Sequence, residues 1–279
     1  MSTFLQRVLK DRILISGVSL LLIITFVALL APLLVAPPQI EIARRLIRPS
    51  FSAPFGTDRM GSDLLASVIW GARSTLLIAT ATATVGVIVG VPIGLVAGYY
   101  RNWLCDCLMK ISDVFLSLPQ IMAAIAITQA LGPSIQSVVL ALSLTYWPFW
   151  ARLVYAETRS VRNEIFVQSA AALGASPMRI MILHILPAIA SSIVVRTSIG
   201  IGATILSAAT LGFLGLGAPP PSPEWGRMIA ESREYLPQAW WYPLAPGSAI
   251  FVTVLAFYLL GDGLRDALDP RLEGGVTKR

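Results

Sequence analysis

The stretch TLLIATATATVGVIVGVPIGLVAGY, residues 75–99, contains no charged side chain. About 20 apolar residues are enough for a helix to cross the hydrocarbon core of a bilayer. Such a stretch must be helical there, because lipid offers the backbone no hydrogen-bond partners. Gly86, Gly90, Gly94 and Gly98 recur at every fourth position and share one helical face, where a second helix can approach closely. The stretch predicts a membrane-spanning helix packed against a neighbour.

Similar stretches recur along the chain, which has 279 residues, 56% of them apolar and only 13% charged. Its mean hydropathy is +0.74, whereas soluble proteins are about 45–50% apolar and about 25% charged. The short connections leave no room for a large catalytic domain. We therefore expect an all-α polytopic membrane protein of six transmembrane helices. The predicted spans are approximately residues 13–35, 75–99, 111–131, 135–153, 188–211 and 244–260.

The basic residues predict the orientation of these helices. With the N-terminus inside, thirteen lysines and arginines fall in inner segments and seven in outer segments, and all three lysines are inside. The positive-inside rule therefore places both termini in the cytoplasm. The net charge of +6 is spread over the ends of apolar stretches, so it does not indicate a nucleic-acid partner. The outer loop over 37–74 departs from this rule, because it contains five arginines. A helix lying along the membrane surface would explain them.

These spans divide the chain into three parts. Residues 1–74 are expected to hold the first span and the outer loop. Residues 73–266 are expected to form the main transmembrane domain, with a cytoplasmic loop over 156–187, and residues 267–279 a cytoplasmic tail. Pro119 is expected to kink the third span, since proline removes a helical hydrogen bond.

The cytoplasmic loop carries signals for two short helices. Asn163 is a favourable N-cap for the first helix, and Gly174 is a natural left-handed terminator. Ser176 is a favourable N-cap for the second helix, with Pro177 at its first position. We expect this helix to end at Pro187, where the next span begins. A small helix that projects from a membrane domain is suited to a groove in another protein.

The same loop resembles a known motif. It is similar to the EAA loop of binding-protein-dependent importer permeases, which inserts into a cleft of the ATP-binding subunit. The chain departs from that pattern where Gln168 replaces Glu, Ser169 replaces Ala and His184 replaces Ile. The resemblance implies that this loop couples the permease to the ATP-binding subunit. The residues that carry it are Gln168, Ser169, Ala170, Gly174, His184, Leu186 and Pro187.

Further motifs extend the resemblance over roughly residues 50 to 272, in the order seen in the dipeptide, oligopeptide and nickel permeases. Within that family the chain is similar to the second of two permease subunits. The resemblance implies the type I ABC importer permease fold and a multi-pass location in the bacterial cytoplasmic (inner) membrane. The motifs are Gly56-Thr57-Asp58-x-x-Gly61-x-Asp63, Gly71-Ala72-Arg73-Ser74, Phe213-Leu214-Gly215-Leu216-Gly217, Trp225-Gly226 and Gly261-Asp262-x-Leu264-Arg265-Asp266-x-Leu268-Asp269-Pro270-Arg271.

The resemblance also implies partners and a cargo. The partners are a second homologous permease subunit, two ATP-binding subunits or domains, and an extracytoplasmic solute-binding protein, with lipid around them. The chain has no Gly-x-x-x-x-Gly-Lys-Ser/Thr phosphate loop. We therefore expect that it is not an enzyme and that partner subunits bind ATP and magnesium and hydrolyse the ATP. Peptides are the expected cargo, and nickel or another small solute is the alternative.

Two other functional classes predict different sequence features. An ion-driven secondary transporter predicts inverted repeats and several ionisable residues at membrane depth. A membrane-embedded hydrolase predicts a nucleophile and a base at that depth. Arg196 is the one charged residue that the spans place near the midplane, about 13 Å beyond Pro187. It lines the translocation path or serves a structural partner. Asp113 is expected to pair with Lys110, three residues away on the same helix.

Overall fold

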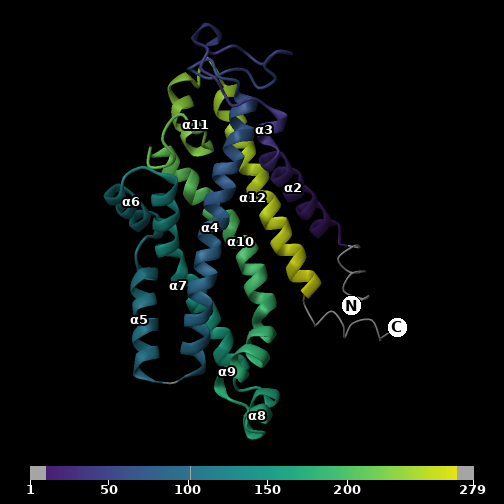
Figure 1. Ribbon diagram of the computed structural model, residues 1–279, viewed down its shortest axis with the longest axis vertical. Coiled ribbons are helices and arrows are strands. Elements are labelled where there is room, and N and C mark those ends of the chain that lie inside the picture. The colour runs from purple at the N-terminus through teal and green to yellow at the C-terminus, as the bar shows by residue number, and fades with distance from the viewer. Residues whose placement is uncertain (1–10, 101, 269–279) are drawn as a thin grey trace.

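The computed structural model describes residues 11–100 and 102–268, which form an elongated bundle of helices (Figure 1). Within these residues, five helices are long and apolar enough to span a membrane, and a sharply bent pair supplies a sixth span. The expectation of six spans is therefore confirmed, with one of the six formed by the bent pair. The spanning helices are α2 (Arg12–Leu29), α4 (Leu64–Tyr99), α7 (Ile135–Val161), α10 (Leu186–Phe213) and α12 (Trp241–Leu268), with the bent pair α5 (Trp103–Ser117) and α6 (Gln120–Leu131).

Helix α4 begins at Leu64, well before residue 75, where the predicted span starts. Asp63 caps the helix by accepting hydrogen bonds from the N–H groups of Leu65 (2.8 Å) and Ala66 (3.2 Å). Arg73, which was assigned to the outer loop, therefore lies on the helix, with its guanidinium over the ring of Trp70. At about 1.5 Å per residue the helix is about 54 Å long, more than the ~30 Å core of a bilayer.

The third span is broken rather than kinked. Helices α5 and α6 meet at 90°, at Leu118 and Pro119. Leu118 has extended backbone angles and Pro119 is the residue that precedes α6. Proline disfavours the helical conformation in the residue before it and cannot donate a helical hydrogen bond, which accounts for the break. The predicted span 111–131 is therefore two helices, and α5 extends back to Trp103.

The glycine stripe of α4 packs against α7 as the sequence predicts. A Cβ atom on Gly90 would lie 2.7 Å from the carbonyl oxygen of Trp147 and 2.9 Å from the backbone nitrogen of Ala151. Gly86 faces the Trp150 indole, and Gly98 faces the Thr158 side chain. Only glycine allows this approach of two helix backbones. Gly94, the fourth glycine of the stripe, likewise faces the backbone of Ala151 and Tyr155.

Helix α2 packs along α12, where Gly17 contacts the backbone of Leu260 and Gly263 contacts Leu14. The beginning of α2 therefore lies beside the end of α12. Both ends face the same side of the membrane, toward the short helices α8 (Ile165–Ala172) and α9 (Pro177–Ile180) at the tip of the bundle (Figure 1). Following α2, a short helix α3 (Ala31–Leu34) leads into the outer segment.

The opposite end of the bundle is closed by the outer segment, residues 41–63, and helix α11 (Trp225–Ser232). The outer segment contains the short helix η1 (Ile42–Arg44), and η3 (Arg233–Tyr235) follows α11. Glu231 of α11 joins the two parts, because it pairs with Arg59 of the outer segment at 3.4 Å, and it also pairs with Arg227 of its own helix at 3.6 Å. The indole N–H of Trp225 donates to the carbonyl oxygen of Val68 on α4 at 2.9 Å.

Candidate functional site

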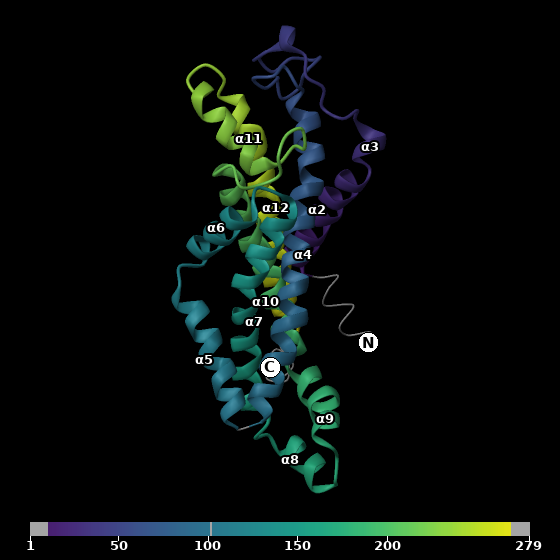
Figure 2. The same ribbon diagram turned by 60° about the vertical axis from the view of Figure 1, so that its left-hand side comes forward.

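The cytoplasmic loop forms a tip below the bundle, built from α8 and α9 (Figure 2). Helix α7 runs to Val161, beyond residue 153 where the predicted span ends, so a three-residue turn is enough to reach α8. Val167, Ile180 and Met181 are buried and pack with Val154 of α7 in one apolar cluster. This cluster fixes the direction in which the tip projects.

Helix α8 ends in the Schellman arrangement that Gly174 predicts. The N–H of Gly174 donates to the carbonyl of Ala171 at 3.0 Å, and the N–H of Ala175 donates to that of Ala170 at 3.1 Å. Gly174 has φ +84°, and a Cβ atom there would meet no other group within 4 Å. The glycine is therefore required for its backbone conformation and not for space.

The predicted cap of α8 is wrong. Glu164 precedes the helix and its side chain makes no capping hydrogen bond. Asn163 belongs to the turn that closes α7, where its backbone N–H donates to Ser160 and its side-chain amide donates to the carbonyl of Arg159 at 3.3 Å. Its side chain is thus engaged with the preceding helix. Gln168 holds the turn instead, by donating to the carbonyl of Asn163 at 3.0 Å.

The second helix begins as predicted but does not end at Pro187. The Ser176 hydroxyl accepts from the N–H of Arg179 at 3.4 Å, with Pro177 at the first helical position. The chain then stays helical from Pro177 to Phe213 through a π-helical turn, η2 (Met181–Ile185). In that turn the N–H of Leu186 donates to the carbonyl of Met181, five residues back. The wider turn lets helix continue into Pro187.

The residues predicted for coupling fall into two groups. Gln168, Ser169, Ala170 and Gly174 lie on α8 and its end, at the tip of the molecule. The other three, His184, Leu186 and Pro187, lie on the rising helix beyond α9.

The tip also presents apolar side chains that sequence reasoning did not single out. Leu173 is 88% exposed and Ile165 is 81% exposed, and Phe166 and Met178 are exposed as well. Together these four residues are called the apolar tip below. Apolar groups that gather on a projecting element are typical of a surface that binds another protein.

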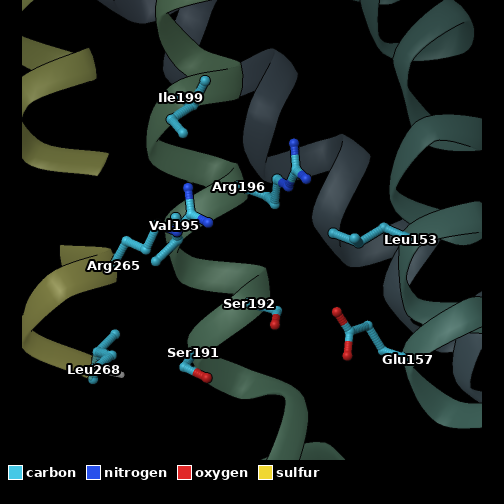
Figure 3. A pocket seen from close by; sticks show the side chains of 9 residues that line it. All are labelled: Leu153, Glu157, Ser191, Ser192, Val195, Arg196, Ile199, Arg265 and Leu268. Carbon is cyan, nitrogen blue, oxygen red and sulfur yellow. The ribbon is translucent and has the colours of Figure 1, made fainter. Parts of the chain in front are cut away.

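Helix geometry places Arg196 nearer the inner end of the spans than the sequence predicts. It lines a cavity with Arg265 and Leu268, which belong to the last turns of α12 (Figure 3). Arg265 is about 36 Å from Trp241 along α12, at about 1.5 Å per residue, and this exceeds the ~30 Å core. Arg196 is therefore near the inner end of the spans. The sequence-based position near the midplane assumed that the span begins at Pro187, whereas the helix begins ten residues earlier, at Pro177.

The cavity has a volume of about 350 Å³ and lies between α7, α10 and α12. Glu157 stands on the α7 side, Arg196 rises from α10, and Arg265 approaches from α12 (Figure 3). Among residues 11–100 and 102–268, no ion pair joins the carboxylate to either guanidinium. The remaining lining residues are Leu153, Ser191, Ser192, Val195, Ile199 and Leu268.

Asp113 pairs with Arg152 of α7 at 3.3 Å, and not with Lys110 as expected. Both side chains of this pair are about half exposed, so the pair contributes at most about 1 kcal/mol. It nevertheless links α5 to α7, whereas the sequence suggested a contact within one helix.

Beyond the outer end of α10 lies a buried carboxylate. Glu224 precedes α11 and is 2% exposed. One oxygen accepts from the N–H of Gly226 at 3.0 Å, while Oε2 has no hydrogen-bond partner. The carboxylate contacts the Cα surfaces of Gly212 and Gly217, where a side chain would collide with it. Burial raises the pKa of Glu224 to about 7, against the opposing hydrogen bond of Gly226 and the charge of Arg227.

Comparison with known proteins places the chain in a family. Over residues 90–274 it matches the family described as the inner membrane component of binding-protein-dependent transport systems. The chain belongs to this family. It is therefore a multi-pass permease subunit of the inner membrane, as the resemblance in its loop motifs implies.

Relatives of the permease cover nearly its whole length. It is 40% identical to the dipeptide transport system permease protein DppC of Alkalihalophilus pseudofirmus, over 96% of this chain and 89% of the relative. It is 38% identical to the di/tripeptide transport system permease protein DppC of Pseudomonas aeruginosa, over 98% and 93%. The glutathione transport system permease protein GsiD of Pectobacterium atrosepticum is 39% identical, over 97% and 91%.

A solved structure supports the fold of the permease. It superposes on a chain of the inward-facing MetNI methionine ABC transporter with a TM-score of 0.60 and 20% identity, covering 74% of this chain and 98% of that chain. The permease accordingly has the type I importer fold that its motifs imply.

Of the three charged cavity residues of the permease, the sequence indicates Arg196 but misses Glu157 and Arg265, for a geometric reason. Glu157 falls in the predicted cytoplasmic loop, because the predicted span stops at residue 153, and Arg265 falls beyond the last predicted span, which ends at residue 260. The signal in the sequence was the stretch from Phe149 to Val161. It contains neither proline nor glycine, so the helix can continue through it. That α7, α10 and α12 meet at one level is a property of the fold.

Proposed function

We propose that the permease imports short peptides and couples their passage to ATP hydrolysis on partner subunits, through docking of the apolar tip. The observation that carries this proposal is the unbroken helix from Pro177 to Phe213. It joins the tip, the cavity beside Arg196 and the outer end near Glu224 in one element of about 55 Å. Movement of a docked partner would therefore reach all three places through one helix.

The proposed assembly has a second homologous permease subunit, two ATP-binding subunits and an extracytoplasmic solute-binding protein. Membership of the family supports binding partners of this kind. Peptide cargo is supported by the relatives named as dipeptide and di/tripeptide permeases. Nickel, the alternative cargo, has no supporting observation: among the described residues, no group of three or more His, Cys, Asp or Glu could hold a metal ion.

Substitution of the apolar tip tests the docking. Leu173→Glu places a charge on a side chain that is 88% exposed, so the bundle should fold normally. Burying an unpaired charge in an interface is costly, and we expect loss of the copurifying ATP-binding subunit and of ATP-dependent uptake. The matched control is Phe51→Glu, an exposed phenylalanine on the outer segment, which should keep the ATP-binding subunit. Retention of that subunit by the Leu173 variant would show that the tip is not the docking site.

The energy source separates this function from secondary transport. Uptake of dialanine into cells or proteoliposomes should depend on ATP and persist with an uncoupler at constant ATP. Uptake driven by an ion gradient without ATP would contradict the proposal.

A further inference from the structure

The cavity between α7, α10 and α12 carries charges of both signs on opposite sides. Glu157 lies on the α7 side, while Arg265 enters from α12 and Arg196 stands between them on α10 (Figure 3). No ion pair closes the gap within the part of the chain that the structure describes. A ligand that carries a negative and a positive group could therefore place an opposite charge beside each of the three residues. The volume of about 350 Å³ falls at the lower end of the ~300–1,000 Å³ typical of small-molecule sites.

We propose that this cavity is a binding site for the two charged termini of a short peptide, with its carboxylate on Arg196 and Arg265 and its ammonium group on Glu157. This rests on the proposed function, since it names how the transported cargo is held at the inner end of the pathway. Guanidinium groups bind carboxylates through paired N–H donors, which makes arginine suited to a peptide C-terminus. A carboxylate is the matching partner for an ammonium group.

The other lining residues fit a peptide whose sequence varies. Ser191 and Ser192 are adjacent on α10 and offer hydroxyl groups that can donate to or accept from a peptide bond. Leu153, Val195 and Ile199 supply apolar surface without a shaped pocket for one particular side chain. Recognition by the termini and the backbone would admit peptides of different composition.

The charges argue against the simpler occupants of such a cavity. A metal cation would meet two guanidinium groups, and like charges at short range are unfavourable. A lipid phosphate would be attracted by Arg196 and Arg265 but repelled by Glu157, and it would leave that carboxylate unpaired. A zwitterion is the ligand for which all three charges are favourable.

Binding to the assembled complex without nucleotide and without the solute-binding protein tests this site. The probes are radiolabelled dialanine, its N-acetyl derivative and its C-terminal amide, measured by equilibrium dialysis against the complex in lipid nanodiscs. Each charge-assisted contact should change affinity by about tenfold to a hundredfold. Wild type should therefore bind dialanine at least tenfold more tightly than either blocked peptide.

The variants should lose discrimination at one terminus each. Arg196→Gln and Arg265→Gln should weaken dialanine about tenfold or more and bind the amide as wild type does. Glu157→Gln should weaken dialanine similarly and bind the N-acetyl peptide as wild type does. Arg152→Gln is the control, because that arginine pairs with Asp113 outside the cavity, and it should bind all three peptides as wild type does. Melting temperatures in detergent check that each variant is folded.

The outcomes distinguish this site from the proposed function. If wild type shows no dialanine binding, or if the three cavity variants bind like wild type, the site is wrong. ATP-dependent peptide uptake that persists in these variants would leave the import function standing. Loss of copurified anionic lipid from the arginine variants, with peptide affinity unchanged, would also overturn the site and assign the cavity to lipid.

Discussion

Replacing Glu224 with glutamine should remove one specific part of the pH dependence of stability. In the folded protein burial raises the pKa of Glu224 from 4.5 to about 7. Between those values the folded state holds a proton that the unfolded state has released, so stability falls as pH rises from about 4.5 through 7 and is then level. At about 1.4 kcal/mol per pH unit, the change from pH 5 to pH 8 amounts to about 2 to 3 kcal/mol.

The glutamine variant keeps the size of the side chain and does not titrate. Its oxygen can accept the hydrogen bond from Gly226, while its amide nitrogen takes the place of the oxygen that has no partner. An unpaired buried amide costs about 1–3 kcal/mol, which offsets part of the gain at high pH. The difference in pH dependence between the two proteins is therefore the quantity to test, and not their absolute stability at one pH.

Thermal unfolding in detergent, followed by intrinsic tryptophan fluorescence from pH 5 to pH 8, measures this difference. The melting temperature of wild type should fall by roughly 5–10 °C more than that of the variant, given about 2–4 °C per kcal/mol for a protein of this size. Glu234→Gln makes the same substitution on an exposed residue of the outer end and should follow wild type. Parallel profiles for wild type and Glu224→Gln would refute the argument from burial.

Three further substitutions test local features of the fold. Gly90→Ala should lower the free energy of unfolding by roughly 1–3 kcal/mol, because its Cβ would collide with the α7 backbone; unchanged chemical denaturation would contradict that packing. Asp63→Ala should cost about 0.5–2 kcal/mol by removing the cap of α4, which the same measurement detects. Gly174→Val and its control Gly132→Val both force a branched residue into positive φ, but only the former should reduce uptake and loosen the ATP-binding subunit, as copurification would show.

Local signals predicted two boundaries of the short helices correctly, because these boundaries depend on neighbours in sequence. Gly174 and Ser176 act as expected, through backbone conformation and a hydroxyl acceptor. Asn163 failed as a cap because two helix ends compete for it, and the end of α7 holds its side chain. Which helix end binds the Asn163 side chain depends on how closely one helix follows the other. Residue preferences do not contain that information.

The extent of the long helices was harder to predict from hydropathy. A hydropathy criterion ends a span at its first charged residues, since it measures what lipid accepts. Helices α4 and α7 continue past that limit, where protein contacts replace lipid: Leu64 is fully buried, and Thr158 packs on Gly98. The same extension carries Glu157 into the cavity. The cavity charges were visible as residues, but their convergence required the arrangement of three helices.

The π-helical turn at Met181–Ile185 has a consequence for how the tip is aimed. A π turn holds one residue more than an α-helical turn, and one residue corresponds to about 100° of rotation about the helix axis. Deleting a single residue there would rotate α9 by about 100° about the helix axis relative to α10, while leaving every side chain of the tip intact. The orientation of the apolar tip therefore depends on the number of residues in this one turn. It is independent of which side chains the tip presents.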